Sequence, residues 1–166
     1  MSIILGIDPG LTRCGVAVIE ASPGRTGTVK YVDVIRTHPD LDTIERISTL
    51  AEKIQGILLD YPIEAVALER VFAQANVKSV MGVAQISGVI FYLTQQQNLP
   101  IALYTPTQVK KAVTGHGRAT KQQVSSMVMK LFHLAEMPKP ADAADALAIA
   151  LCHAWNYHPG LPRKKQ

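Results

Sequence analysis

Residues 3–10 read Ile-Ile-Leu-Gly-Ile-Asp-Pro-Gly, an apolar run that stops at an acid and a turn dipeptide. A short apolar run closed by Pro-Gly is typical of a buried β-strand that enters a turn. We therefore expect the chain to begin with a buried strand from Ile3 to Asp8, which presents the carboxylate of Asp8 where the strand ends.

Working outward from this strand, alternating apolar residues predict two further strands at 15–20 and 28–37, joined by a hairpin loop at 21–27 that contains proline and glycine. Apolar residues then recur at helical spacing from 44 to 58, and a Tyr-Pro dipeptide ends that helix. A short apolar run at 65–69 predicts a fourth strand.

The second half of the chain alternates helices with one more strand. In order, the expected elements are a helix at 77–97, a strand at 101–104, and helices at 106–113, 120–131 and 141–155. The order βββ-α-β-α-β-α predicts an α/β protein with a mixed five-stranded sheet and helices on both faces.

The length of 166 residues fits one domain, which we place at residues 1–157, followed by a basic, disordered tail at 158–166. No apolar run approaches the roughly 20 residues of a membrane span, and no basic leader precedes the first strand. Cys14 and Cys152 stand far apart, so neither a zinc site nor a disulfide framework is indicated. We expect a cytoplasmic protein without membrane contact.

The net charge of +4 is unevenly distributed along the sequence. Residues 70–135 contain seven bases and no acid, whereas the rest of the chain contains ten bases and thirteen acids. Such a basic segment fits either a solvated surface or a surface that binds a polyanion. Polyanion binding becomes the better interpretation where a chemical site adjoins the bases.

Acids stand at the predicted ends of two strands, since Asp8 closes the first strand and Glu69 closes the fourth. Open α/β sheets bind ligands at the carboxyl ends of adjacent parallel strands, so the two carboxylates can share one cation. Each acid also has a simpler interpretation. Asp8 suits a turn residue that accepts backbone N–H bonds, and Glu69 suits an ion pair with Arg70 or another base.

Two more acids, Asp142 and Asp145, lie in an alanine-rich helix that begins after Pro140 and share one face of it. Asp142 also suits the helix dipole, whereas Asp145 lies a turn deeper among alanines, where a buried charge needs a cation. Oxygen ligands without Cys or clustered His favour Mg²⁺ or Mn²⁺ over zinc. Two such ions can bind and hydrolyse a phosphodiester.

The acids and bases fall into five segments with a fixed order along the chain. They are Gly6-Ile7-Asp8-Pro9-Gly10, Ala67-Leu68-Glu69-Arg70-Val71-Phe72, Gln108-Val109-Lys110-Lys111, Gly115-His116-Gly117-Arg118-Ala119-Thr120-Lys121 and Ala141-Asp142-Ala143-Ala144-Asp145-Ala146-Leu147-Ala148. The ordered set resembles the RuvC family of Holliday-junction resolvases from Ile3 to about His153, and it is more specific than any single motif.

The resemblance implies a ribonuclease H-like fold and a homodimer that makes paired, Mg²⁺-dependent nicks at four-way DNA junctions in recombination and repair. It implies two Mg²⁺ ions per active site, with Mn²⁺ as a substitute, and the RuvA-RuvB branch-migration helicase as partner. Catalysis and metal binding are implied for Asp8, Glu69, Asp142 and Asp145. DNA contacts are implied for Phe72, Lys110, Lys111, Arg118 and Lys121.

Three alternatives remain open. A ribonuclease H-like nuclease of the RuvX/YqgF type, associated with ribosomal RNA processing, shares the opening strand and acid. An actin-like ATP-binding fold also places an Asp beside a glycine-rich hairpin, but it normally needs two such domains. A silent DNA-binding module would not need four acids inside a polyanion-binding surface. The Ala-Asp-Ala-Ala-Asp helix and the acid-free segment favour the resolvase.

The helix at 77–97 contains no acid and only one base, Lys78. We expect it to expose Gly82, Gln85, Ser87 and Gly88 among apolar residues and to supply much of a two-fold interface. The alternative is that it forms the buried central helix of a monomer.

Overall fold

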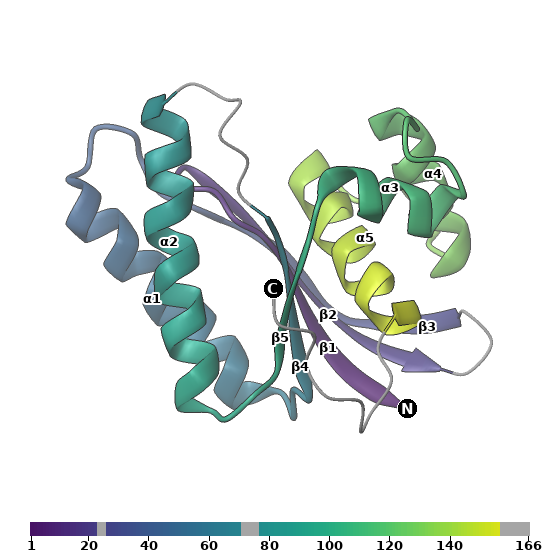
Figure 1. The fold of residues 1–166 in the computed structure, drawn as a ribbon, viewed down its shortest axis with the longest axis horizontal. Helices are drawn as coiled ribbons and strands as arrows, with labels where there is room; N and C mark the ends of the chain where they lie inside the picture. Colours follow the sequence, from purple (N-terminus) through teal and green to yellow (C-terminus); the bar gives the residue numbers. More distant parts are fainter. Residues whose placement is uncertain (23–25, 71–76, 157–166) are drawn as a thin grey trace.

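The computed structural model of the chain describes residues 1–22, 26–70 and 77–156. Its elements follow one another in the order shown in Figure 1. The strands are β1 (Ser2–Asp8), β2 (Arg13–Ser22), β3 (Thr26–Arg36), β4 (Ala65–Glu69) and β5 (Ile101–Tyr104). The helices are α1 (Thr43–Asp60), α2 (Val77–Gln96), α3 (Pro106–Thr114), α4 (Lys121–Leu131) and α5 (Ala141–Asn156).

The strands form one mixed sheet in the order β3-β2-β1-β4-β5. β1 pairs antiparallel with β2 and parallel with β4, while β5 continues the parallel half beyond β4. β1 therefore lies at the centre of the sheet. Because Ile7 is level with Leu68 in the parallel pair, β1 and β4 end side by side.

Helices cover both faces of the sheet, with α1 and α2 on one face and α3, α4 and α5 on the other (Figure 1). Side chains alternate between the two faces of a strand. On β1, Leu5 and Ile7 accordingly pack in the core beneath α1 and α2, whereas Ile4 packs in the core beneath α5. The face that carries Ile4 also carries Gly6 and Asp8.

α5 packs directly against the backbone of the two central strands. A Cβ atom added to Gly6 would overlap the carbonyl oxygen of Ala146, and one added to Gly15 would overlap the carbonyl oxygen of Asp142. The helix side of this contact is almost all alanine, and Ala146 and Ala150 are fully buried. Small residues on both sides let the helix approach closely, which brings the amino end of α5 to the end of β1.

α2 presents two different faces, which corrects part of the expectation for this helix. Gly82 and Ser87 point inward, because they lie on the helix face that also buries Ile86. Gln85 and Gly88 point outward as expected. The helical period puts Gly82 and Ile86 on one face, and this period outweighs the small size of the residues.

The predicted fold class and the order of elements are confirmed, including the mixed five-stranded sheet with helices on both faces. The single domain at 1–157 stays a prediction, and the proposed tail at 158–166 lies outside the described residues. Across the part of the chain that the structure describes, no helix is long and apolar enough to cross a membrane.

Candidate active site

Two carboxylates leave neighbouring parallel strands at the same edge of the sheet. Asp8 is the last residue of β1 and Glu69 is the last residue of β4. The strand alternation points both toward α5, because Asp8 follows Gly6 and Glu69 follows Ala67 on that face. Both acids are half-buried. Of the ion pairs among described residues, none joins Glu69 to Arg70.

α5 contributes the other two carboxylates from its first two turns. Asp142 and Asp145 have side chains that are 22% and 23% exposed, so neither is a freely solvated surface acid. The close contact of α5 with Gly15 fixes where Asp142 lies relative to the end of β1. We call Asp8, Glu69, Asp142 and Asp145 the acid cluster.

Clustering and burial make the ionised forms of Asp8, Glu69 and Asp145 unfavourable. Burial, followed by the neighbouring charges of Glu69, Asp145 and Asp142 in that order, raises the pKa of Asp8 to about 8. Burial also raises the pKa of Glu69, with Asp145 as the main charged neighbour. Acids that resist ionisation near neutral pH without a compensating cation are typical of a functional site.

Two bases stand against the acid cluster. Lys121, at the start of α4, places its Nζ 3.5 Å from Oδ2 of Asp145, and it lowers the pKa values of Asp8, Glu69 and Asp145. Arg13, the first residue of β2, places its Nε 3.4 Å from Oδ2 of Asp142. These bases are 78% and 57% exposed, so the pairs add little stability and remain accessible to an approaching ligand.

The chemistry of the acid cluster suits a hard divalent cation, because its donors are carboxylate oxygens. The four carboxylates are not arranged as a complete coordination sphere. Within residues 1–22, 26–70 and 77–156, no three His, Cys, Asp or Glu side chains are grouped so that they could hold one ion. Asp142 and Asp145 instead face Arg13 and Lys121. Binding of a cation would require these carboxylates to turn away from their basic partners.

The residues expected to contact DNA are distributed over several places. Lys110 lies close enough to Glu69 and Asp145 to lower the pKa values of both, as Lys121 does. Lys111 lines a hollow with Tyr104 and Trp155, away from the acids. Arg118 lines another hollow, with His116 and Lys130. Phe72 lies outside the described residues.

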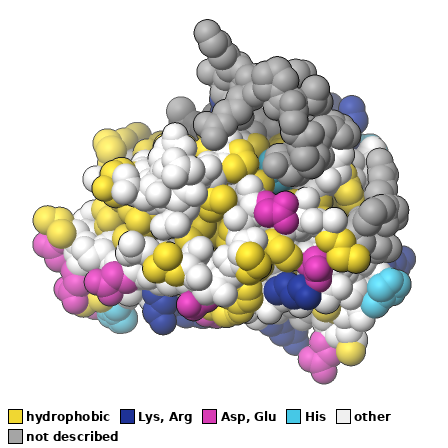
Figure 2. Space-filling model, turned by 90° about the horizontal axis from the view of Figure 1, so that it is seen from below, with side chains coloured by type: hydrophobic (Ala, Val, Ile, Leu, Met, Phe, Trp, Pro, Cys, Tyr) yellow, Lys and Arg dark blue, Asp and Glu magenta, His cyan; other side chains and the backbone are white. Residues whose placement is uncertain are grey.

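Basic side chains are not gathered into a single patch on every face of the molecule. On the face in Figure 2, acidic and basic side chains are scattered among hydrophobic and other polar ones. That face looks onto the end of the molecule opposite the carboxyl ends of β1 and β4. The net charge alone therefore does not mark a phosphate-binding face.

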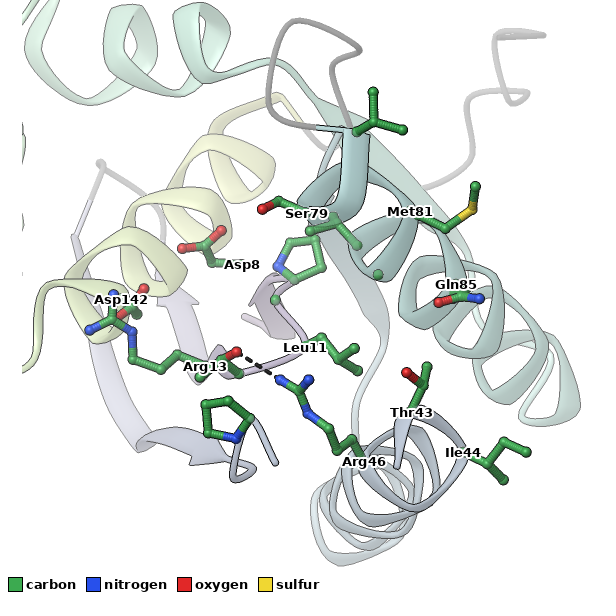
Figure 3. Close-up of a pocket in the computed structure, with 17 residues that line it drawn as sticks. Asp8, Leu11, Arg13, Thr43, Ile44, Arg46, Ser79, Met81, Gln85 and Asp142 are labelled. Atoms are coloured by element: carbon green, nitrogen blue, oxygen red, sulfur yellow. Dashed lines mark hydrogen bonds and ion pairs between the residues drawn. The ribbon is translucent and has the colours of Figure 1, made fainter. Parts of the chain in front are cut away.

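A groove of about 1260 Å³ begins at the acid cluster and runs between the β1–β2 turn and the amino ends of α1 and α2. Figure 3 shows Asp8 and Asp142 at one end of it, with Arg13 extended toward Asp142, and Met81 and Gln85 of α2 at the other. Arg46 of α1 reaches across toward the turn from below. The groove gives an extended ligand a path that leads to the acids.

The acids could be named from the sequence, whereas the residues that position them were not predicted. Gly6 and Gly15 admit α5, and Arg13 pairs with Asp142. The sequence does offer one signal, because Arg13, Gly15 and Ala17 alternate along a strand next to β1 and so share a face. Arg46 is separated from the turn by more than thirty residues, and nothing local connects the two.

A mixed sheet with this strand order, with acids at the ends of two adjacent parallel strands and on the helix that crosses them, defines a nuclease of the ribonuclease H-like class. A family model described as "Crossover junction endodeoxyribonuclease RuvC" matches residues 4–153. The chain belongs to the RuvC family.

Relatives with the same description come from several bacteria. The protein of Leifsonia xyli is 53% identical over 152 residues, which cover 92% of this chain and 73% of the relative. That of Saccharopolyspora erythraea is 51% identical over 152 residues, covering 92% and 76%. These relatives are similar over nearly the whole of the described structure.

Solved structures agree with this assignment. Thermus thermophilus RuvC in complex with a Holliday junction substrate superposes with a TM-score of 0.90, is 33% identical and covers 94% of each chain. The yeast mitochondrial Holliday junction resolvase Ydc2 has a TM-score of 0.64 at 13% identity and covers 92% of this chain and 79% of its own, which supports the fold alone.

Proposed function

We propose that this chain resolves four-way DNA junctions by hydrolytic cuts made at the acid cluster. The observation that carries the proposal is the meeting of Asp8, Glu69, Asp142 and Asp145 beside two exposed bases, at one end of an open groove. The family description and the Thermus thermophilus relative solved with a Holliday junction substrate supply the substrate class.

The four acids are the residues that would hold divalent cations, with Mg²⁺ as the expected ion and Mn²⁺ as a substitute. When bound, two such ions would activate a water and stabilise the leaving oxygen of the cut strand. Lys110 and Lys121 stand where they can contact phosphates next to the cut, and they limit the repulsion between the acids and the DNA. For Phe72, Lys111 and Arg118 we propose contacts farther along the junction.

We also propose that the protein acts as a two-fold homodimer, with the outer face of α2 at the interface. This face exposes large apolar side chains that do not line the groove, with Phe91 38% and Tyr92 63% exposed. At Gly88, halfway along it, a Cβ atom would meet no other group within 4 Å. Two matched cuts across a nearly two-fold symmetric junction need two sites, and closed pairing through one surface supplies them.

The expected partners and location follow the family. We propose that the dimer works with the RuvA-RuvB branch-migration helicase on junction DNA in the cytoplasm, in recombination and repair. The RuvX/YqgF type of nuclease is disfavoured because the family model covers residues 4–153 as RuvC.

The proposal is tested by incubating the protein and Mg²⁺ with a synthetic four-way junction, a linear duplex and an RNA-DNA hybrid. We expect paired nicks in the junction alone. Asp145→Asn should abolish cutting and leave junction binding intact, because the amide keeps the shape but loses the charge that holds a cation. Asp60→Asn, at an exposed acid on α1, is the matched control and should cut normally.

Two results would contradict the proposal. Full Mg²⁺-dependent cleavage by the Asp145→Asn protein would remove the acid cluster from the mechanism. Preferential cutting of the RNA strand of the hybrid would assign the chain to a different class of ribonuclease H-like nuclease.

A further inference from the structure

The turn between β1 and β2, residues 9–12, connects two residues of the candidate site. Asp8 precedes the turn and Arg13 follows it, and Arg13 pairs with Asp142 of α5. The position of this turn therefore influences both the carboxylate at the end of β1 and the base that faces α5. What holds the turn in place bears directly on the geometry of the site.

Thr37, just after β3, holds the turn from one side. Its hydroxyl donates to the carbonyl oxygen of Leu11 at 2.5 Å, and its backbone N–H donates to the carbonyl oxygen of Thr12 at 3.1 Å. Thr37 is only 7% exposed, so water competes little for these hydrogen bonds. The two successive carbonyl groups of the turn are thereby tied to one residue.

Arg46, one turn into α1, completes the arrangement. Its Nε donates to the hydroxyl oxygen of Thr37 at 2.9 Å, and its Nη2 donates to the hydroxyl oxygen of Thr12 at 2.7 Å, the bond drawn as a dashed line in Figure 3. The Thr37 hydroxyl thus accepts from Arg46 while it donates to Leu11. The planar guanidinium can make both bonds at once, which a single ammonium group cannot do with the same geometry.

α2 holds the turn from the opposite side. A Cβ atom added to Gly82 would lie 3.2 Å from Cδ2 of Leu11, so the helix packs closely on this side chain. The turn is therefore clamped between α1 and α2, although neither helix carries a residue of the acid cluster.

We propose that Arg46 is a positioning residue for the active site, which acts through Thr12 and Thr37 to hold Asp8 and Arg13 in register with α5. The inference rests on the proposed function, because it gives the turn a role in binding divalent ions. Among the described residues, the side-chain hydrogen bonds of Arg46 go to Thr12 and Thr37 and to no member of the acid cluster. Arg46 affects the geometry of the carboxylates that bind a cation, and the affinity of the protein for DNA does not depend on Arg46.

The test measures Mn²⁺ binding from the electron paramagnetic resonance signal of the free ion, using the whole protein without DNA. Arg46→Met keeps the apolar stem and removes the donors, and Arg46→Lys keeps the charge without the two-point geometry. We expect both to weaken Mn²⁺ binding at least tenfold. Lys53→Met, an exposed base two turns along α1, makes the same charge change and should stay within twofold of the unchanged protein.

Thr37 supplies an independent pair of variants in case the Arg46 variants fold poorly. Thr37→Val removes the shared hydroxyl and should weaken Mn²⁺ binding as Arg46→Met does, whereas Thr37→Ser keeps the hydroxyl and should restore binding to within about threefold. Junction affinity in EDTA and the Tm are measured for every variant. We expect the affinity to stay within twofold of that of the unchanged protein.

Unchanged Mn²⁺ binding in a folded Arg46→Met or Thr37→Val protein would overturn the inference. So would a loss of junction affinity with Mn²⁺ binding intact, because Arg46 would then contact DNA from the groove. Failure of the proposed function would be distinguished from failure of this inference, because the protein without any substitution would then leave four-way junctions uncut.

Discussion

Asp8 should make the protein less stable than it would be with an uncharged residue at that position. Its pKa rises from 3.8 to about 8 on folding, chiefly by burial. The folded protein therefore keeps this proton at pH values where the unfolded chain releases it. Asp8 therefore costs the folded protein no stability at low pH, where it is protonated in both states. The free energy of unfolding falls as the pH rises from about 4 toward 8.

The size of the effect follows from the two pKa values. A pH of 7 lies about 3 units above the pKa of the Asp8 carboxyl in the unfolded chain. Each unit corresponds to about 1.4 kcal/mol, so ionisation of Asp8 favours the unfolded chain by about 4 kcal/mol at this pH. Asp8→Asn removes this difference and keeps a polar side chain of the same shape. We expect the substitution to raise the free energy of unfolding at pH 7 by up to about 4 kcal/mol, which is a rise in Tm of up to about 8–16 °C for a chain of this length.

The assay is thermal and urea unfolding in EDTA at pH 4, 5.5, 7 and 8.5. The gap between Asp8→Asn and the unchanged protein should be largest at pH 8.5 and close toward pH 4. Glu52→Gln, at an exposed acid on α1, is the control and should show no such gap. If Asp8→Asn is no more stable at pH 7, or if its gain does not vary with pH, the account of the acid cluster is wrong.

Three further predictions follow from other parts of the molecule. Lys121→Ala should weaken junction binding and reduce the slope of log affinity against log salt by about one, whereas an unchanged slope would argue against a phosphate contact. Gly88→Glu should give a folded monomer in sedimentation that no longer makes paired cuts, and a persistent dimer would exclude the outer face of α2. Burial lowers the pKa of His153 from 6.5 to about 4. The neutral ring therefore adds about 3 kcal/mol to the free energy of unfolding above pH 6.5, and this stability is lost as the pH falls to 4. His153→Gln should flatten that loss in urea unfolding, and an unaltered acid limb would assign it to other groups.

The elements of this fold could be predicted because their signals are local. The apolar run before Asp8, the alternation in β2 and β3 and the helical spacing in α1 each lie within one short window. Both capping boxes, at Thr105 with Gln108 and at Thr120 with Gln123, likewise involve residues three apart. Local patterns of this kind are sufficient for the order of the elements, whereas their bounds differ by a few residues, as for β2, expected at 15–20 and observed at Arg13–Ser22.

The acids of the candidate site could be named for a related reason. Asp8 and Glu69 end apolar runs, and Asp142 and Asp145 share a helix face, so local structure already gives each its orientation. Whether they serve as ligands is a separate question, which the Mn²⁺ and cleavage measurements address.

The supports of the site could not be predicted, because each depends on contacts between distant parts of the chain. Arg46 meets Thr12 only because α1 and the β1–β2 turn are neighbours in the folded chain, 34 residues apart in sequence. The close packing of Gly82 against Leu11 likewise joins residues that are far apart in sequence. Composition suggested an exposed small residue there, and tertiary packing decided otherwise.

The contact of α5 with Gly6 and Gly15 has a consequence for how this nuclease can change over time. The strand main chain there meets the main chain and the alanine Cβ atoms of the helix, so the spacing between the strand acids and the helix acids depends on small residues on both sides of the contact. A single added methyl group at Gly6 would act as a wedge and move Asp142 and Asp145 away from Asp8 and Glu69, although each acid would remain in place on its own element.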